Sequence, residues 1–254
     1  MALIFNKAAE FVFEPPSQVA WARRILIKPS AAYPLLHPIT TSRETLEIVI
    51  SGIREVSDAD IVLLEGSPGG QPMRSLYRNL GYDFPRILAL DVKDSPLVEV
   101  ENPLAHPFAI ATFWLPNIVL YCDYLISVAP CKIYGKEGCF CISNLLSLLP
   151  LSKYQQGWSV LYSLGIQKVI ADLYFTLPFN LGIVDARKRF ISERSPTQGQ
   201  IEPFGKIFVG EPYKVDSLVS QMMNLETEHL RLIGLAKEEL QSKQSQGEAN
   251  PPRQ

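Results

Sequence analysis

Two lysines and two acids stand at the ends of apolar runs in this 254-residue chain, where β-strands would end. Lysine ammonium groups suit phosphate or carboxylate ligands as point charges, and carboxylates can serve as general bases. Because parallel strands present their carboxyl ends at one rim of a sheet, we expect these side chains to share a site there. Lysines that extend to solvent and acids that cap helices are the alternative interpretation. We predict that Lys132 and Asp185 have catalytic roles. Lys28 and Glu65 are predicted to bind the ligand.

A glycine-rich turn, residues 66–70, follows Glu65 directly. Consecutive backbone amides in such a turn can bind an anion, and glycine equally suits a tight strand-to-helix turn with positive φ. Pro68 removes one of these amides, and neither a dinucleotide-binding glycine pattern nor a phosphate-loop lysine follows. Anion binding is therefore one hypothesis beside the architectural one, with candidate residues Gly66, Ser67, Gly69 and Gly70.

The histidines and cysteines do not form the pattern of a metal centre. Of the three histidines, His37 is the best catalytic candidate, because it lies in the loop that follows Lys28. Cys139 and Cys141 would share one face of a strand, but their spacing matches neither zinc pairs nor iron–sulphur ligands. We therefore predict no bound metal. The sequence also lacks the nucleophile elbow of the hydrolases.

The order of apolar runs and helical patterns predicts an α/β fold. Strands are expected at 24–28, 61–65 and 86–90, and the first connecting helix begins with a capping box from Thr41 to Glu44. Such a series predicts a mostly parallel central sheet with helices on both faces, and a small extra lobe or hairpin. Further along the chain, residues 108–114 and 118–122 are expected to form a hairpin or edge strands. Additional strands are expected at 124–129, 181–185 and 206–209, and helices at 72–80, 166–174 and 215–222. The polar segment 187–204 is expected to be a loop.

The amino-acid composition of the chain indicates which classes of binding partner and which cellular locations to expect. The chain is 47% hydrophobic and 20% charged with a formal net charge of −2, which supplies a core but no basic surface for nucleic acid. Pro116 and Asp123 interrupt the longest apolar stretch, so no membrane span is predicted. The start of the chain lacks the pattern of a signal peptide, and a cytoplasmic location is expected. We expect an extension at 1–23, one α/β domain at 24–240 and a disordered tail at 241–254.

Short motifs along the chain occur in the order typical of the domain of unknown function 362 family, which the chain resembles over residues 24–222. The motifs are Ile27-Lys28-Pro29, Thr40-Thr41, Gly66-Ser67-Pro68-Gly69, residues 123–132, Ser143-Asn144-Leu145-Leu146, Ile183-Val184-Asp185, and Gly210-Glu211-Pro212 followed by Val215-Asp216. The resemblance implies an α/β fold and adds Asn144 and Asp216 as ligand-binding residues. Many members are fused to a ferredoxin-like module, but no Cys-x-x-Cys-x-x-Cys run occurs here, so no iron–sulphur cluster is expected.

The chain also departs from the pattern of that family. Only Lys132 remains of a basic stretch that usually carries histidine, Ser143 stands where a lysine is usual, and Glu211 replaces an aspartate. These losses leave open whether the protein is an enzyme. The predicted function is binding of a small anionic molecule at the rim of the sheet. The alternative is a non-catalytic member that acts as an interaction or assembly module through residues 108–121; homo-oligomerisation and the identity of any cofactor stay open.

Overall fold

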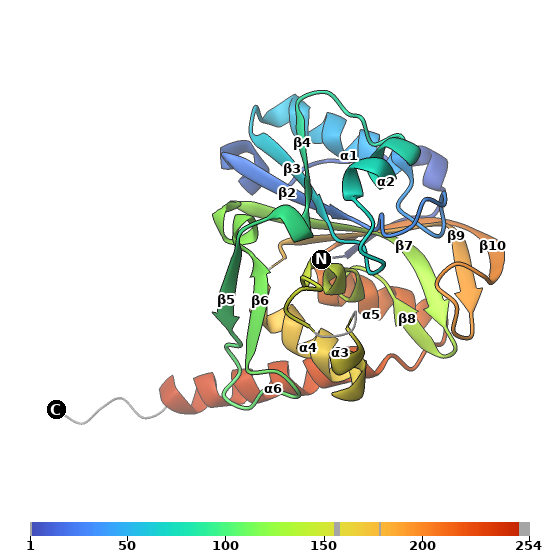
Figure 1. The fold of residues 1–254 in the computed structure, drawn as a ribbon. Coiled ribbons are helices and arrows are strands. Elements are labelled where there is room, and N and C mark those ends of the chain that lie inside the picture. Colours follow the sequence, from blue (N-terminus) through green and yellow to red (C-terminus); the bar gives the residue numbers. More distant parts are fainter. Residues whose placement is uncertain (1, 155–157, 178, 249–254) are drawn as a thin grey trace.

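The computed structural model describes residues 2–154, 158–177 and 179–248, whose strands form one large sheet and one small sheet (Figure 1). The large sheet has the order β1-β10-β9-β7-β2-β3-β4, with β8 paired to β7. Neighbouring strands from β9 to β4 are parallel, whereas β10 is antiparallel to both β9 and β1. The sheet is therefore mostly parallel, as predicted. Its strands are β1 (Ala2–Phe5), β2 (Arg24–Pro29), β3 (Asp60–Glu65), β4 (Ile87–Asp91), β7 (Tyr124–Tyr134), β8 (Glu137–Cys139), β9 (Leu181–Ser192) and β10 (Gln200–Gly210).

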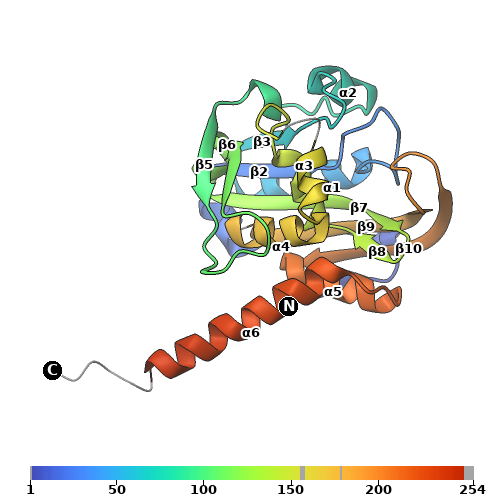
Figure 2. The ribbon, with the colours of Figure 1, turned by 60° about the horizontal axis from the view of Figure 1, so that its bottom comes forward.

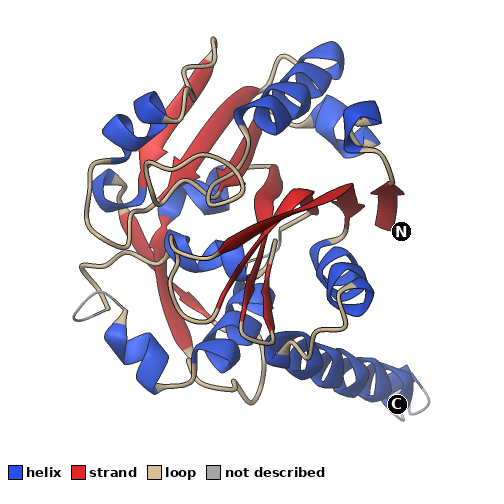
Figure 3. Cartoon of the chain, turned by 90° about the vertical axis from the view of Figure 1, so that its right-hand side faces the viewer, coloured by secondary structure: helices blue, strands red, loops and turns tan. Residues whose placement is uncertain are grey.

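Helices cover both faces of this sheet (Figure 3). On one face, α1 (Arg43–Val56) and α2 (Met73–Asn79) bury their apolar sides against alternate residues of β2 and β3, such as Ile27 and Leu63. The intervening residues, such as Leu26, point to the other face. There they meet α3 (Ser159–Ser163), α4 (Ile166–Thr176) and the two-stranded sheet of β5 (Leu97–Glu101) and β6 (Thr112–Pro116). This alternation confirms the α/β fold with helices on both faces.

The first helix begins one residue later than the capping box predicts. Ser42 is the N-cap of α1, and its hydroxyl accepts from the backbone N–H of Thr45 at 3.3 Å. Thr41 has a different role, because its hydroxyl accepts from the N–H of Ser30 and donates to the carbonyl of Val128, both at 2.7 Å. Thr41 thus ties the loop after β2 to the neighbouring strand β7.

Two predicted connections are wrong. Residues 118–122 do not form a strand of a hairpin with 108–114: β6 pairs with β5 instead, and Asn117–Tyr121 is a 3₁₀ helix. The segment 187–204 is not a loop, because β9 and β10 continue through most of it as an antiparallel ribbon. Its polar sequence reflects exposed strands, which Arg189 and Glu202 join by an ion pair of 2.6 Å.

The first and last described segments of the chain form regular structure. The N-terminal strand β1 pairs with β10, so part of the expected extension 1–23 is an edge of the sheet. Next to it, α5 (Pro212–Met222) covers β9 and β10. The last helix, α6 (Glu228–Glu248), extends into the predicted tail and projects beyond the rest of the chain in Figure 2. Within the described residues, no helix is long and apolar enough to cross a membrane.

Candidate functional site

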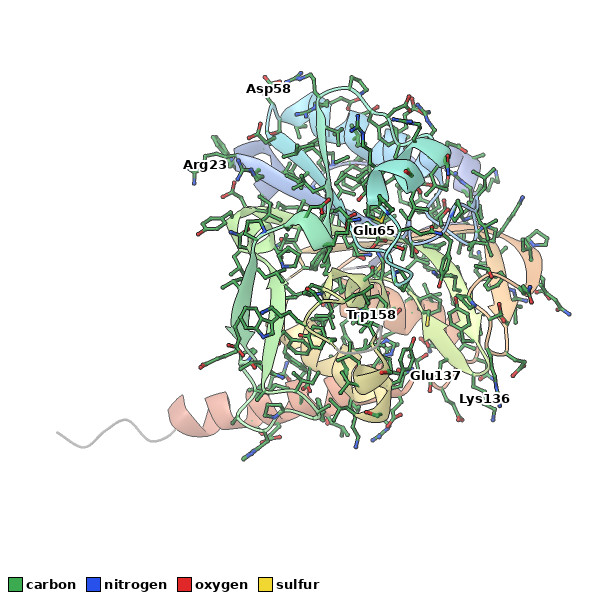
Figure 4. The ribbon with its side chains drawn as sticks, in the orientation of Figure 1. Arg23, Asp58, Glu65, Lys136, Glu137 and Trp158 are labelled. Atoms are coloured by element: carbon green, nitrogen blue, oxygen red, sulfur yellow. The ribbon has the colours of Figure 1, made fainter. Side chains whose placement is uncertain are left out.

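A cavity of about 530 Å³ lies where β2 and β3 end. Its walls come from the loop after β2, the turn after β3, the β7–β8 hairpin, the segment 143–147, the helices α3 and α4 and the ribbon end near 193–196. Figure 4 labels Glu65, Trp158 and Glu137, which come from three of these walls. Polar lining residues include Ser30, Tyr33, Glu65, Lys132, Tyr134, Cys139, Ser143, Asn144, Ser147 and Tyr162, and apolar ones include Phe140, Leu146, Trp158, Ile166 and Ile170.

The lengths of the central strands create this space. β2 pairs with β7 only as far as Pro29, opposite Val128, whereas β7 continues to Tyr134. Pro29 has no N–H to continue the ladder, and the chain leaves the sheet there. Because β9 flanks β7 along both halves, β8 pairs with β7 on the side that β2 has vacated. The far half of β7 therefore forms a wall that extends beyond its neighbour.

Lys28 and Glu65 form a buried ion pair beside the cavity. The Lys28 Nζ lies 3.0 Å from Glu65 Oε1, and both side chains are almost fully inaccessible to solvent. The ammonium also donates to the carbonyl of Pro29 at 2.8 Å and to Asn144 Oδ1 at 3.1 Å. Burial lowers the pKa of Lys28, and the charge of Glu65 opposes this shift. With three acceptors, one of them charged, the hydrogen-bonding capacity of Lys28 is filled.

Glu65 is held from several directions. Its Oε2 accepts from the N–H of Ala31 at 2.8 Å, and its Oε1 accepts from the N–H of Gly66 at 2.9 Å and from the hydroxyl of Ser147. These bonds connect the ends of β2 and β3 to the segment 143–147. Glu65 thus lines the cavity, and with Lys28 behind it forms a fixed, charge-balanced pair.

Lys132 is differently placed, on the far half of β7. Its Nζ donates to Ser30 Oγ at 3.2 Å and to the carbonyl of Ile39 at 3.4 Å, both of them neutral groups. Among the described residues, no carboxylate forms an ion pair with it. Burial lowers the pKa of Lys132, while Glu65 and Cys139 favour its charged form. The cavity therefore contains an ammonium group that has no carboxylate partner in the described structure.

Asn144 orders the floor of the same cavity. Its Nδ2 donates to the carbonyl of Lys28 and to Ser127 Oγ, each at 3.1 Å, while its Oδ1 accepts from Lys28. The Ser127 hydroxyl in turn donates to the carbonyl of Cys141 at 2.8 Å. The structure thus brings together Lys28, Glu65, Lys132 and Asn144 from the sequence-predicted set.

Asp185 and His37 lie together elsewhere. The Asp185 Oδ2 accepts from Thr45 Oγ1 of α1 at 2.6 Å, and its Oδ1 lies 3.3 Å from His37 Nε2 and accepts from the N–H of Arg187 at 3.1 Å. Although burial opposes ionisation, the hydrogen bonds and charges of His37 and its other neighbours lower the pKa of Asp185. Neither Asp185 nor His37 lines the cavity. This cluster faces α1, not the group around Lys132.

The glycine-rich turn uses its backbone internally. The N–H of Gly66 donates to Glu65, the N–H of Gly70 donates to the carbonyl of Ser67 at 3.0 Å, and the Ser67 hydroxyl accepts from Gln71. Gly70 has a φ of +70°, which suits a residue without a side chain. Of the five turn residues, only Pro68 lines the cavity. These contacts favour the architectural interpretation of the turn.

Asp216 anchors a helix. It lies in α5 and accepts from the N–H groups of Cys141 and Ile142 at 3.0 and 2.8 Å. Burial raises its pKa to about 7, although both backbone hydrogen bonds favour the carboxylate.

Burial also raises the pKa of the Cys139 thiol, to about 11. Across the described residues, no group of three or more His, Cys, Asp and Glu side chains is arranged to hold a metal ion.

Sequence reasoning did not identify several lining residues. Ser147 contacts Glu65, and Ser30 contacts Lys132. Tyr33, Tyr134 and Tyr162 also line the cavity. These five residues come from several elements and share no sequence motif. Residues 108–121, the alternative contact surface, range from buried, as at Phe113 and Leu115, through half-buried, as at Ile118, to exposed, as at Leu120 and Tyr121.

Comparison with known proteins places this geometry in a wider context. The sequence profile described as "Domain of unknown function (DUF362)" matches residues 25–221. The rat synaptosomal-associated protein 47 is 32% identical over 119 residues, which are 46% of this chain and 26% of that protein. The chain thus spans about a quarter of the length of this curated relative. The lactate racemase apoprotein from Thermoanaerobacterium thermosaccharolyticum has a similar fold, with a TM-score of 0.53, 13% identity, and coverage of 85% of this chain and 53% of that one.

Proposed function

The chain belongs to the domain of unknown function 362 family, and we propose that this member binds a small anionic molecule in the cavity beyond β2 and β3. The observation that carries the proposal is Lys132, an ammonium group in the cavity wall whose acceptors are both neutral. A cation removed from water gains most from a charged, hydrogen-bonded partner. An anionic ligand would supply the carboxylate or phosphate oxygen that the described protein does not.

The neighbouring charges support this assignment. Glu65 is the acid nearest to both lysines, and its contact with Lys28 at 3.0 Å neutralises it. The ligand would therefore meet Lys132 as an unpaired positive charge, with Ser143 and Asn144 as nearby polar residues. The aromatic and aliphatic residues Phe140, Trp158 and Ile170 would contact its apolar part.

The proposal covers binding by Lys132, with Lys28, Glu65 and Asn144 as positioning residues, because both N–H groups of Asn144 already donate to Lys28 and Ser127. We do not extend it to Asp185 and His37, because their contacts are with α1, with Arg187 and with one another, outside the cavity. Asp216 acts through the backbone of residues 141–142, so we assign it a structural part. The turn residues Gly66, Ser67, Gly69 and Gly70 shape the end of β3.

Binding can be tested with acetate, benzoate, inorganic phosphate and phenyl phosphate as probes. Thermal unfolding and titration calorimetry would compare the wild type with Lys132→Met. At a ligand concentration of a hundred times Kd, stabilisation of the wild type is expected to be about 2.7 kcal/mol. Loss of a charge-assisted hydrogen bond should weaken binding by about tenfold or more in the variant.

Lys136→Met is the matched control, because Lys136 is an exposed lysine at the tip of the β7–β8 hairpin (Figure 4). This variant should bind the probes as the wild type does. If no probe stabilises the wild type, or if Lys132→Met and Lys136→Met bind equally well, the proposed function is wrong.

A further inference from the structure

Three tyrosine hydroxyl groups surround the cavity without a hydrogen-bond partner among the described residues. Tyr33 comes from the loop after β2, Tyr134 from the end of β7 and Tyr162 from α3. Tyr77, Tyr82, Tyr154 and Tyr174, in contrast, use their hydroxyls in hydrogen bonds within the protein. Tyr33 and Tyr134 are half-buried, and Tyr162 is 60% exposed at the cavity. The three phenols therefore offer hydroxyl donors that a molecule in the cavity can reach.

The pKa values of the three phenols are all shifted upward. Burial is the main cause that raises the pKa of Tyr134, and Cys139, Tyr33 and Tyr162 add to the shift. Burial also raises the pKa of Tyr33, with a contribution from Tyr162, and the pKa of Tyr162, with a contribution from Cys139. At neutral pH the hydroxyls are therefore protonated and able to donate.

Cys139 connects the phenols to Lys132. It lies directly opposite Lys132 in the pairing of β7 with β8, and its thiol interacts electrostatically with Lys132, Tyr134 and Tyr162. Cys139, Lys132 and the three phenols thus all line the same cavity. A ligand group beside Cys139 would face both kinds of donor.

The acids at the cavity are engaged or exposed. Glu65 pairs with Lys28, and Glu137 accepts from the N–H of Glu228 at 3.1 Å. Glu193 is exposed at the ribbon end, next to Arg194, which also lines the cavity. The donors in the interior therefore have no carboxylate partner among the described residues.

We propose that the ligand carries a phosphoryl group, bound by the ammonium of Lys132 and the hydroxyls of Tyr33, Tyr134 and Tyr162. Lys132 has one N–H left after its bonds to Ser30 and Ile39, so together with the phenols the cavity offers four donors. A phosphate monoester presents three terminal oxygens to such a set, whereas a carboxylate presents two. The apolar wall with Phe140 and Trp158 would hold the organic part of the ester. This inference rests on the proposed function of the cavity.

Titration calorimetry with phenyl phosphate and benzoate tests the inference, because the two probes share a ring and differ in the anion. Phenyl phosphate should bind the wild type about tenfold or more tightly than benzoate. Each of Tyr33→Phe, Tyr134→Phe and Tyr162→Phe removes one hydroxyl and keeps the ring, and should weaken phenyl phosphate binding by about threefold or more. Tyr121→Phe, an exposed tyrosine outside the cavity lining, should leave binding unchanged.

The outcomes separate the two proposals. If benzoate binds as tightly as phenyl phosphate, or if the three cavity variants bind phenyl phosphate as the wild type does, the phosphoryl assignment is wrong. In that case, loss of benzoate binding in Lys132→Met would still support the proposed function. If neither probe binds the wild type, both proposals fail. Circular dichroism of each variant confirms that its fold is intact.

Discussion

Lys28 and Lys132 are two lysines at one end of the same sheet, and their surroundings differ sharply. Lys28 has a carboxylate at 3.0 Å and two further acceptors, and its side chain is inaccessible to solvent. Lys132 has two neutral acceptors at 3.2 and 3.4 Å and lines a cavity. Burial lowers the pKa of both. Lys28 thus has its charged partner within the protein, whereas Lys132, whose acceptors among the described residues are neutral, is the lysine that the proposed function assigns to a ligand.

Removal of the internal partner should have the largest effect. In Glu65→Gln, Lys28 keeps its position but loses its counter-charge, and the free energy of unfolding should fall by about 3–5 kcal/mol. Urea denaturation measures the loss. Glu99→Gln, on the exposed side of β5, should cost less than about 1 kcal/mol. A loss below about 1 kcal/mol in Glu65→Gln would remove the distinction between the two lysines.

A further base, His229, is buried and forms no ion pair among the described residues. Its Nδ1 lies 2.6 Å from Gln167 Oε1, its Nε2 has no hydrogen-bond partner in the described structure, and burial lowers its pKa to about 3. Between its ordinary pKa of about 6.5 and about 3, the unfolded chain binds a proton that the folded one does not. Acidification from pH 6.5 to pH 5 should therefore cost about 2 kcal/mol of stability through His229.

Urea denaturation across this pH range measures the slope. His229→Gln should flatten it by the amount that His229 contributes, whereas His106→Gln, an exposed histidine, should keep the slope of the wild type. Equal slopes in the wild type and His229→Gln would show that burial alone does not hold a base neutral in this core.

Replacement of Lys132 should change stability much less than replacement of Lys28. Lys132→Met loses two bonds to neutral acceptors and gains apolar contact, so its free energy of unfolding should stay within about 1 kcal/mol of the wild type. Lys28→Met leaves Glu65 buried without a counter-charge and should cost about 3–5 kcal/mol. Parallel urea curves give both values, and similar losses would contradict the assignment of different roles.

The smallest effect is expected at Ser30. Its hydroxyl accepts from Lys132 at 3.2 Å, while its backbone N–H is held separately by Thr41. Ser30→Ala should therefore lower the free energy of unfolding by only about 0.5 kcal/mol. The same urea assay, with Ser143→Ala as a second lining serine, measures it. A loss as large as that of Glu65→Gln would mean that Lys132 depends on its neutral partners.

The sequence predicts the parallel half of the fold well, and the reason is physical. Strands buried on both faces, such as β2 and β3, leave continuous apolar runs that are visible without structural information. β5 and the β9–β10 ribbon carry charged residues on exposed faces, and this half-polar pattern resembles a loop. Thr41 and Ser42 can both cap a helix, and the contact of Thr41 with Val128 decides between them.

Part of the candidate site could also be predicted. The ends of the parallel strands β2 and β3 share a rim, which is why Lys28 and Glu65 come together. Lys132 joins them because β7 continues beyond the end of β2. That these residues bind a ligand stays a prediction. A position at the rim does not determine which face of the sheet a side chain points to. Asp185 lies two residues after Ile183 and therefore points to the same face, which α1 covers. The three phenols could not be found, because Tyr33, Tyr134 and Tyr162 are far apart in the chain and meet only in the folded protein.

The strand order of the sheet also constrains how the molecule can assemble. The central pair β2 and β7 joins segments about a hundred residues apart, and β9 adds to β7 only after a further long crossover. Contacts between such distant segments must overcome the entropy of closing long loops, which makes folding slow. The cavity draws its walls from residues 30 to 196, so a growing chain on the ribosome cannot complete it until most of the protein has been synthesised. We expect the helices and strands of the first ninety residues to form early and the cavity to form among the last steps of folding.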